Sequence, residues 1–239
     1  LDAVFFPKIY ENPKIFNQEA WHYELKSQDA PLIYKGVVYN EMKGAFSDPS
    51  RLVNYHLNKN LFPDNTYGNS SGGFPDRITD LTYEEFKNFH KTYYHPVNSY
   101  LYLYGNSDLD KDLSFINNAY LSKFEKLDKE ASIKPQEPFD EMKKVVEFYP
   151  VGKSDNTDNK TFLNISWVAG EGANQALTMQ MRILAEALVN HESGPIKLAL
   201  QEAGIGRDIS ASYSANKQGV FEINVKNANL VDREKFYTI

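Results

Sequence analysis

The sequence predicts an α+β fold, and two kinds of pattern support this class. Apolar residues recur every three or four positions over residues 32–43, 49–61 and 174–190, which is the period of a helix with one buried face. Residues 161–170 and 208–226 instead concentrate β-branched and aromatic residues between turn signals, as strands do. We therefore expect antiparallel sheets with helices packed chiefly on one face.

The composition is that of an ordinary globular protein. The chain has 239 residues, of which 41% are hydrophobic and 24% charged, enough for one large domain or two of about 120 residues. No window approaches the roughly 18 apolar residues that a membrane span needs, so we expect a soluble protein with no membrane span. The chain opens on Leu1 with core-type residues, which predicts a piece cut from a longer protein.

Charge and cysteine content exclude several functions. The net charge is −6 and the sequence shows no basic stripe, so we expect no nucleic-acid partner. The chain has no cysteine, which excludes disulfides and thiolate chemistry. Any metal must therefore be held by His, Asp or Glu side chains.

In the first half of the chain we expect helices, joined by loops, and one strand. Residues 2–25 have apolar residues at helical spacing, broken by two prolines, and lead through a turn to helices over 32–43 and 49–61. Residues 62–78 are rich in Pro, Gly and Asn and predict a long loop. The remaining elements are a helix with a Thr-x-x-Glu capping box, a strand, and a helix capped by Asp108, over residues 82–95, 99–106 and 108–124.

The second half begins after a charged, proline-containing stretch, residues 125–141, which has little to bury and reads as an interdomain linker. Two strands, a long helix, a short helix closed by glycine, and a hairpin-like pair of strands follow. Leu177, Met181, Leu184 and Leu188 share one face of the long helix. These elements occupy residues 143–151, 161–170, 174–190, 194–206 and 208–226.

Glu41 stands out because it lies at helical spacing behind two valines. At about 100° per residue, Val37, Val38, Glu41 and Ala45 share a face, which predicts that the carboxylate points toward the apolar side of its helix. A charge facing a core needs a partner. Two interpretations stay open from spacing alone, a buried acid paired with Lys or Arg and a metal ligand whose companions lie elsewhere.

No other spacing in the sequence completes a metal site or a known nucleophile motif. His90 and His95 are five residues apart and lie about 140° around a helix from one another, so they cannot chelate one ion. We expect His22, His90 and His95 to be structural. Neither a Gly-x-Ser-x-Gly elbow nor a phosphate-binding glycine loop occurs.

Four long strings give a more specific signal: "FNQEAWHYEL", "YKGVVYNEMKGAFSDP", "NTYGNSSGG" and "FHKTYYHPVNSYLYLYGN". In this order and at these separations they resemble the presequence protease and falcilysin branch of the pitrilysin/insulinase zinc metallopeptidases. The resemblance covers residues 1–125 well. Residues beyond it resemble the start of a second homologous domain more loosely, through "TFLNISWVAG", "LALQEAGIG" and "GVFEINVK".

The resemblance implies a fold of two homologous units, each a metallopeptidase α/β roll and both incomplete. Residues 1–127 would form the C-terminal part of the first, zinc-bearing domain. Residues 128–141 would be the linker, and residues 142–239 the N-terminal part of the second domain.

The resemblance also implies site residues. Glu41 matches the family's third zinc ligand. Tyr67 and Ser71 lie in a loop that resembles a segment near the substrate chamber, although such a loop is also typical of a plain connector. Gly219, Val220 and Phe221 lie in a strand that resembles one pairing with the substrate by strand addition, the alternative being an ordinary edge strand.

The implied function is a zinc metalloendopeptidase that degrades unfolded peptides, such as targeting peptides, inside a closed chamber. The His-x-x-Glu-His motif of the family is absent from this sequence, so we expect no catalytic residue in this chain, no zinc held by it alone and no activity on its own. Its partners would be unfolded peptides and the rest of the parent chain, in a bacterial cytoplasm or an organelle matrix. The alternative is a non-catalytic peptide-binding or assembly subunit of the same superfamily.

Overall fold

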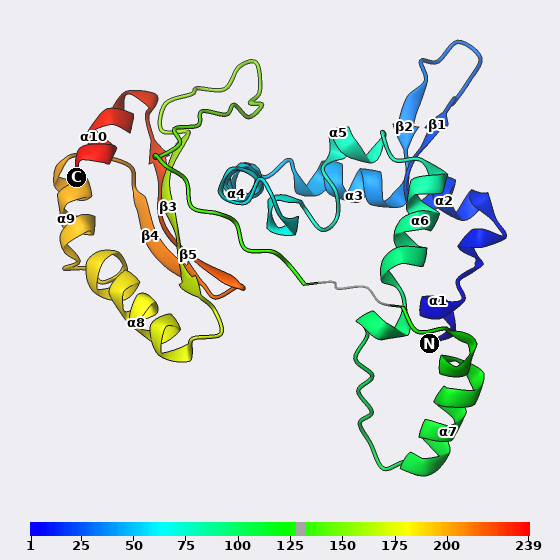
Figure 1. The fold of residues 1–239 in the computed structure, drawn as a ribbon. Coiled ribbons are helices and arrows are strands. Elements are labelled where there is room, and N and C mark those ends of the chain that lie inside the picture. The colour runs from blue at the N-terminus through cyan, green and yellow to red at the C-terminus, as the bar shows by residue number, and fades with distance from the viewer. Residues whose placement is uncertain (128–131) are drawn as a thin grey trace. The chain divides into compact units, whose positions relative to one another are not determined.

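The computed structural model describes residues 1–127 and 132–239 (Figure 1). Residues 128–131, the first part of the predicted linker, lie outside the described residues. The chain divides into two compact units, the first formed by Leu1–Asp48 and Ser70–Ser132 and the second by Pro49–Asn69 and Ile133–Ile239. Both units combine helices with antiparallel strand pairs, which confirms the α+β class.

The two units interleave in the sequence. Residues 49–69 belong to the second unit although they come before most of the first. The division predicted from the resemblance, at 127 and 142, concerns homologous domains rather than contacts, and it stays a prediction.

The first unit is mostly helical, with one short hairpin. β1 (His22–Glu24) pairs antiparallel with β2 (Ile33–Lys35), so that Tyr23 lies opposite Tyr34. The helical elements are α1 (Asp2–Phe5), η1 (Lys8–Tyr10), α2 (Pro13–Glu19), α3 (Val37–Ala45), α5 (Pro75–Ile78), α6 (Tyr83–Tyr93), η3 (Pro96–Asn98), α7 (Leu109–Ala119) and η4 (Leu121–Lys123).

The predicted cap of α6 is confirmed in atomic detail. The Thr82 hydroxyl oxygen accepts a hydrogen bond from the Glu85 amide at 3.2 Å, and the Glu85 carboxylate accepts one from the Thr82 amide at 2.9 Å. The start of α6 is therefore fixed by local chemistry. Asp108 likewise caps α7 by accepting from the Lys111 amide at 3.2 Å.

Two predictions for the first unit are wrong. The helix expected over residues 32–43 begins only at Val37, because residues 33–35 pair with β1 as a strand. The strand expected over residues 99–106 is extended but has no partner strand among the described residues, and the side chain of Tyr100 is fully exposed. Alternation of side chains predicts an extended backbone, but a ladder also requires a neighbouring strand.

The second unit is a three-stranded antiparallel sheet in the order β3–β5–β4, with helices on one face (Figure 1). The strands are β3 (Thr161–Glu171), β4 (Asp208–Ser214) and β5 (Gln218–Ala228). Its helical elements are α4 (Pro49–Leu61), η2 (Thr66–Gly68), α8 (Gln175–Ala185), the π-helical turn η5 (Glu186–Asn190), α9 (Pro195–Glu202), η6 (Leu230–Asp232) and α10 (Arg233–Thr238).

The core of the second unit lies between one face of the sheet and α8, η5, α9 and α10, and no described residue of α4 belongs to it. One face of the sheet is apolar and packs on helix residues that are almost completely buried; the cluster includes Leu163, Ile209, Phe221, Ile223, Val225, Ala185, Val189 and Leu200. The other face is mostly polar, with the buried Val220 as an exception. Polar side chains on it bond to one another across strands, as in the 2.6 Å contact between Asn164 and Asn224. This alternation is the pattern of an antiparallel sheet with one buried face.

Most second-unit elements match the prediction. The helix over 49–61, the strand over 161–170 and the hairpin over 208–226 are confirmed. The single helix expected over 174–190 is α-helical over Gln175–Ala185 and continues as the π-helical turn Glu186–Asn190. Leu184 is an exception, since it is exposed while Ala185 takes the buried position. The strand expected over 143–151 is wrong, because these residues are described without pairing.

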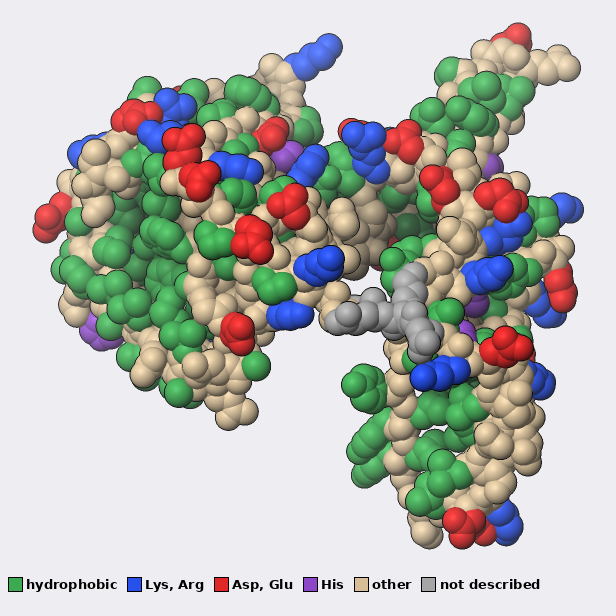
Figure 2. Space-filling model, viewed as in Figure 1, with side chains coloured by type: hydrophobic (Ala, Val, Ile, Leu, Met, Phe, Trp, Pro, Cys, Tyr) green, Lys and Arg blue, Asp and Glu red, His purple; other side chains and the backbone are tan. Residues whose placement is uncertain are grey.

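Several apolar side chains on the outer surface of α8 and α9 are exposed, among them Met179, Ile183 and Leu198 (Figure 2). Within residues 1–127 and 132–239, no helix is both long and apolar enough to cross a membrane.

Candidate functional site

Glu41 lies on the surface of α3, so the expectation that it points inward is wrong. Two faces of α3 could pack against the rest of the unit. Val37, Glu41 and Ala45 lie on one face, and Met42 and Phe46 lie on the other. The second face is buried, with Met42 only 7% exposed. It is favoured because it removes two large apolar side chains from water and leaves the carboxylate hydrated.

Ser71 lies in the first unit, close to the buried side of α3. It is exposed, and the next residue, Gly72, packs so tightly on α3 that an added Cβ would lie 2.4 Å from the Met42 sulfur. Phe74 continues this contact, with its ring 5.0 Å from the ring of Phe46. The structure therefore places Ser71 near the helix that carries Glu41, although the Glu41 carboxylate faces solvent.

Tyr67 belongs to the second unit, where its loop forms a pocket of about 460 Å³ at the C-terminal end of α4. Phe62 is almost completely buried beneath the loop, with its ring 5.4 Å from that of Tyr67. A Cβ on Gly68 would lie 2.3 Å from the Phe62 carbonyl oxygen, so the loop requires glycine there. The pocket is lined by Tyr55, Lys59, Phe62, Pro63, Asp64, Asn65, Thr66, Gly68 and Asn69.

The structure brings Tyr67 to the beginning of β5. The backbone amide of Lys217 donates a hydrogen bond to the Tyr67 hydroxyl oxygen at 3.1 Å. Two residues further on, Gly219 approaches Tyr213 so closely that a Cβ would lie 1.8 Å from the Tyr213 hydroxyl oxygen. Tyr67 and Gly219, two residues that the resemblance selected, thus belong to one neighbourhood. Sequence reasoning missed Lys217, because no local pattern joins residues 150 positions apart.

The strand-addition route predicted for Gly219, Val220 and Phe221 does not fit this structure. β5 is the central strand: Val220 lies opposite Val168 of β3 and Ser214 of β4, and Phe221 lies opposite Trp167 and Tyr213. Both edges of β5 are therefore already paired, so it is neither an edge strand nor free to accept another strand. Only β3 and β4 have an edge that faces away from β5.

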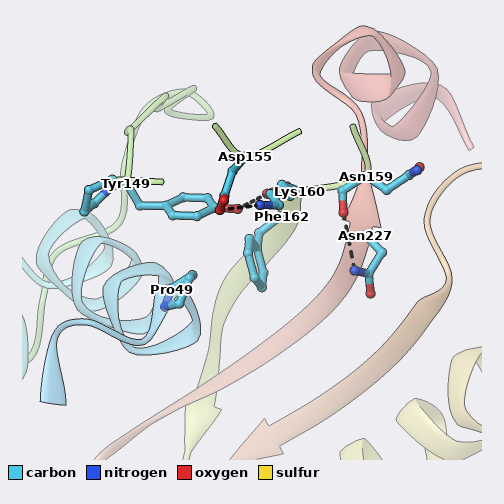
Figure 3. A pocket seen from close by; sticks show the side chains of 8 residues that line it. Pro49, Tyr149, Asp155, Asn159, Lys160, Phe162 and Asn227 are labelled. Carbon is cyan, nitrogen blue, oxygen red and sulfur yellow. Dashed lines mark hydrogen bonds and ion pairs between the residues drawn. The ribbon is translucent and has the colours of Figure 1, made fainter. Parts of the chain in front are cut away.

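A second pocket, of about 350 Å³, lies where the loop before β3 meets Asn227 (Figure 3). The Lys160 ammonium and the Asp155 carboxylate are 2.9 Å apart, and this contact holds the pKa of Asp155 below its usual value. Tyr149 donates a hydrogen bond from its hydroxyl to the Lys160 carbonyl oxygen. Because the Lys160 ammonium is already paired with the Asp155 carboxylate, this pocket offers no unbalanced charge to a ligand.

The histidines make structural contacts. In His90, Nε2 donates to the Val4 carbonyl oxygen and Nδ1 accepts from the Tyr10 hydroxyl, both at 2.8 Å. His22 bonds the Asn17 carbonyl oxygen at 2.7 Å, and His95 accepts from the Val97 amide at 3.2 Å. These bonds agree with the predicted structural roles.

The residues that the structure describes do not fit a zinc ion by themselves. No group of three or more His, Asp or Glu side chains among them is arranged to hold a metal. Glu41 supplies one carboxylate, and zinc sites in proteins use three or four ligands.

The sequence matches the family model described as "Peptidase M16 inactive domain" over residues 80–237, more than half of the chain. It is 43% identical to Protein HypA of Clostridium perfringens over 237 residues, covering 99% of this chain and 24% of HypA. It is 37% identical to Presequence protease 1, chloroplastic/mitochondrial, of Arabidopsis thaliana over 234 residues, covering 96% of this chain and 22% of that protein. The chain thus spans about a quarter of the length of these relatives.

Two solved structures also match. A protease from Helicobacter pylori is 13% identical with a TM-score of 0.43, covering 95% of this chain and 62% of that one. An M16-like peptidase from Alicyclobacillus acidocaldarius is 18% identical with a TM-score of 0.39, covering 82% and 48%. Both scores are below 0.5, so the assignment rests on the sequence matches. By those matches, the chain belongs to the peptidase M16 family, among relatives that include presequence proteases.

Proposed function

We propose that this chain is part of a zinc metalloendopeptidase that degrades unfolded peptides, such as targeting peptides, inside a closed chamber. The observation that carries the proposal is the similarity to presequence proteases along almost the whole chain. The bacterial cytoplasm or an organelle matrix is the proposed location, in line with the mitochondrial and chloroplast names of several relatives.

Glu41 is the proposed zinc ligand from this chain. Its carboxylate is exposed and forms no hydrogen bond or ion pair with another described residue, so it is free to bind an ion whose other ligands come from the remainder of the parent protein. Lys43, on the same helix, lies over the ring of Tyr39, and its ammonium is engaged there.

Peptide contact is proposed for Tyr67 and Ser71, and an indirect contribution to peptide binding is proposed for Gly219, Val220 and Phe221. The pocket beside Tyr67 supports this role, since it combines an aromatic floor with amide, hydroxyl and carboxylate groups. Such a mixture suits an unfolded peptide, whose backbone and side chains are both exposed. Val220 and Phe221 are already paired on both sides, and Gly219 packs against Tyr213, so these three residues would contribute by shaping the sheet near this loop.

The test compares three proteins: the full-length parent, the same parent with Glu41→Gln, and residues 1–239 alone. Each is analysed for zinc content and for cleavage of an unstructured presequence-type peptide. We expect the parent to bind zinc and cleave, and the other two to lose both properties. Glu11→Gln, another exposed glutamate of the first unit, is the matched control and should leave both unchanged. Full zinc occupancy and activity in the Glu41→Gln parent would refute the ligand assignment.

A non-catalytic peptide-binding or assembly subunit is the second candidate. The description of the matched family model as an inactive domain favours it. The same experiment separates the two candidates, because a subunit of this kind would bind the peptide without holding zinc or cleaving it.

A further inference from the structure

Gln136 lies in a stretch without helix or strand, yet it is the one polar side chain among the residues described that is counted as buried, at 6% exposure. Both polar atoms of its side-chain amide have a partner. The side-chain oxygen accepts from the Asp64 backbone amide at 3.0 Å, and the side-chain nitrogen donates to the Asp64 carboxylate at 2.7 Å. A buried amide with matched partners holds two segments in one geometry.

The backbone of Gln136 is held from the opposite direction by Gln218, the first residue of β5. The Gln136 amide donates to the Gln218 side-chain oxygen at 2.6 Å, and the Gln218 side-chain nitrogen donates to the Gln136 carbonyl oxygen at 2.9 Å. Asp64, Gln136 and Gln218 thus form a chain of four hydrogen bonds, which we call the glutamine clasp.

Neighbouring contacts run alongside the clasp. The Asn65 side chain donates to the Lys134 carbonyl oxygen at 3.2 Å, and the Lys217 ammonium donates to the Ile133 carbonyl oxygen. Together with the bond from Lys217 to Tyr67, they tie residues 133–136 to the pocket loop on one side and to the β4–β5 turn on the other.

We propose that Gln136 is a positioning residue that fixes the Phe62–Asn69 loop in the shape that receives peptide. This inference rests on the proposed function of that loop. Gln136 does not line the pocket. It acts through Asp64, which does, so the stretch that joins the two halves of the sequence also sets the geometry of the pocket.

The donor and acceptor pattern of the clasp gives a sharp test. Gln136→Glu would set a negative oxygen against the Asp64 carboxylate, whereas Gln136→Glu with Asp64→Asn exchanges donor and acceptor and restores the pair. Gln136→Ala removes the side-chain bonds and leaves the backbone bonds to Gln218. Glu137→Ala, at the exposed neighbouring position, is the matched control.

Two measurements are made on residues 1–239 with each variant. Amide hydrogen exchange reports the loop over residues 62–69, and fluorescence anisotropy with a labelled, unstructured presequence-type peptide reports affinity. We expect Gln136→Ala and Gln136→Glu to speed exchange in the loop and weaken peptide binding by about tenfold, which corresponds to one or two lost hydrogen bonds. The double variant should recover slow exchange in the loop, whereas its peptide affinity also reports the loss of the Asp64 carboxylate from the pocket. Glu137→Ala should change neither property.

The outcomes separate the two proposals. If the unmodified chain does not bind the peptide, the proposed function of the loop fails, and the positioning role fails with it. If the unmodified chain binds and Gln136→Ala speeds loop exchange without weakening binding, only the positioning role is overturned. Failure of the double variant to recover slow loop exchange would also overturn it, because the exchanged donor and acceptor should hold the loop as the original pair does.

Discussion

The side-chain amide of Asn190 pairs with both backbone groups of Ala211, donating to its carbonyl oxygen at 3.0 Å and accepting from its amide at 2.8 Å. Ala211 is in the middle of β4, an edge strand of the second sheet. The side chain thus occupies groups that another strand would otherwise use. Edge strands invite such pairing, and natural proteins commonly block them.

Replacing Asn190 by alanine should therefore have two effects. The free energy of unfolding should fall by about 1–3 kcal/mol, because two buried backbone groups lose their partner. Self-association through the β4 edge should increase. Urea unfolding checks the first effect and size-exclusion chromatography at several concentrations the second. Glu186→Ala, an exposed change in the same π-helical turn, serves as the control. An unchanged unfolding midpoint for Asn190→Ala would contradict the role.

Gly219→Ala should destabilise the second unit by about 1–3 kcal/mol, the typical cost of forcing an extra carbon into a packed site. The added Cβ would overlap the hydroxyl of Tyr213, which donates to the Ala169 carbonyl oxygen and cannot move without losing that bond. Thermal unfolding measures the change. Gly44→Ala, in a helix with no atom near the new Cβ, is expected to stabilise instead. Equal effects at both positions would show that the contact with Tyr213 is unimportant.

The cap of α6 predicts a pH dependence. Hydrogen bonds from the hydroxyl and the backbone amide of Thr82 hold the pKa of Glu85 below its ordinary value of 4.5. Because the pKa is lower in the folded state, the cap stabilises fully above that ordinary value and is lost as the pH falls through the folded value. An NMR titration should show a midpoint below 4.5 that rises in Thr82→Ala and stays low in Thr82→Ser. A Glu85 midpoint at or above 4.5 in the unmodified chain would show that the cap does not lower the pKa of Glu85.

His90 joins three segments of the first unit through Val4, Tyr10 and its own helix. Burial raises the pKa of Tyr10, which keeps its hydroxyl protonated and able to donate to His90. His90→Ala should lower the free energy of unfolding by about 2 kcal/mol through the loss of two hydrogen bonds. Chemical denaturation measures this, with the exposed Asn88→Ala on the same helix as the control. Loss of zinc or of peptide binding without loss of stability would instead indicate a functional histidine.

Local signals predicted much of the fold. The capping box at Thr82 and Glu85, the helix over 49–61 and the β4–β5 hairpin all depend on residues close in sequence, and all are found. The predictions of strands over 99–106 and 143–151 were wrong because strand pairing depends on a distant partner. The pattern of one segment does not specify that partner.

The candidate site was predicted less completely. The resemblance singled out Tyr67 and Gly219, but the bond from Lys217 to Tyr67 spans 150 residues and has no local signature. The helix around Glu41 contained two apolar stripes one residue apart, and only packing decided that Met42 is inside. Gln136 lay in a stretch whose charges and prolines indicated a linker, although its side chain is buried.

Each unit is built from two segments that alternate along the sequence, and this limits how the chain can be divided into separate fragments. A single cut anywhere in the chain leaves at least one unit without part of its contacts, since α4 and the loop after it precede most of the first unit. A fragment cloned from residue 142 onward would lack both α4 and Gln136. Isolating either half for biophysical work therefore calls for rearranged connectivity, with residues 49–69 fused to residues 133–239 and the remaining segments rejoined by a designed bridge.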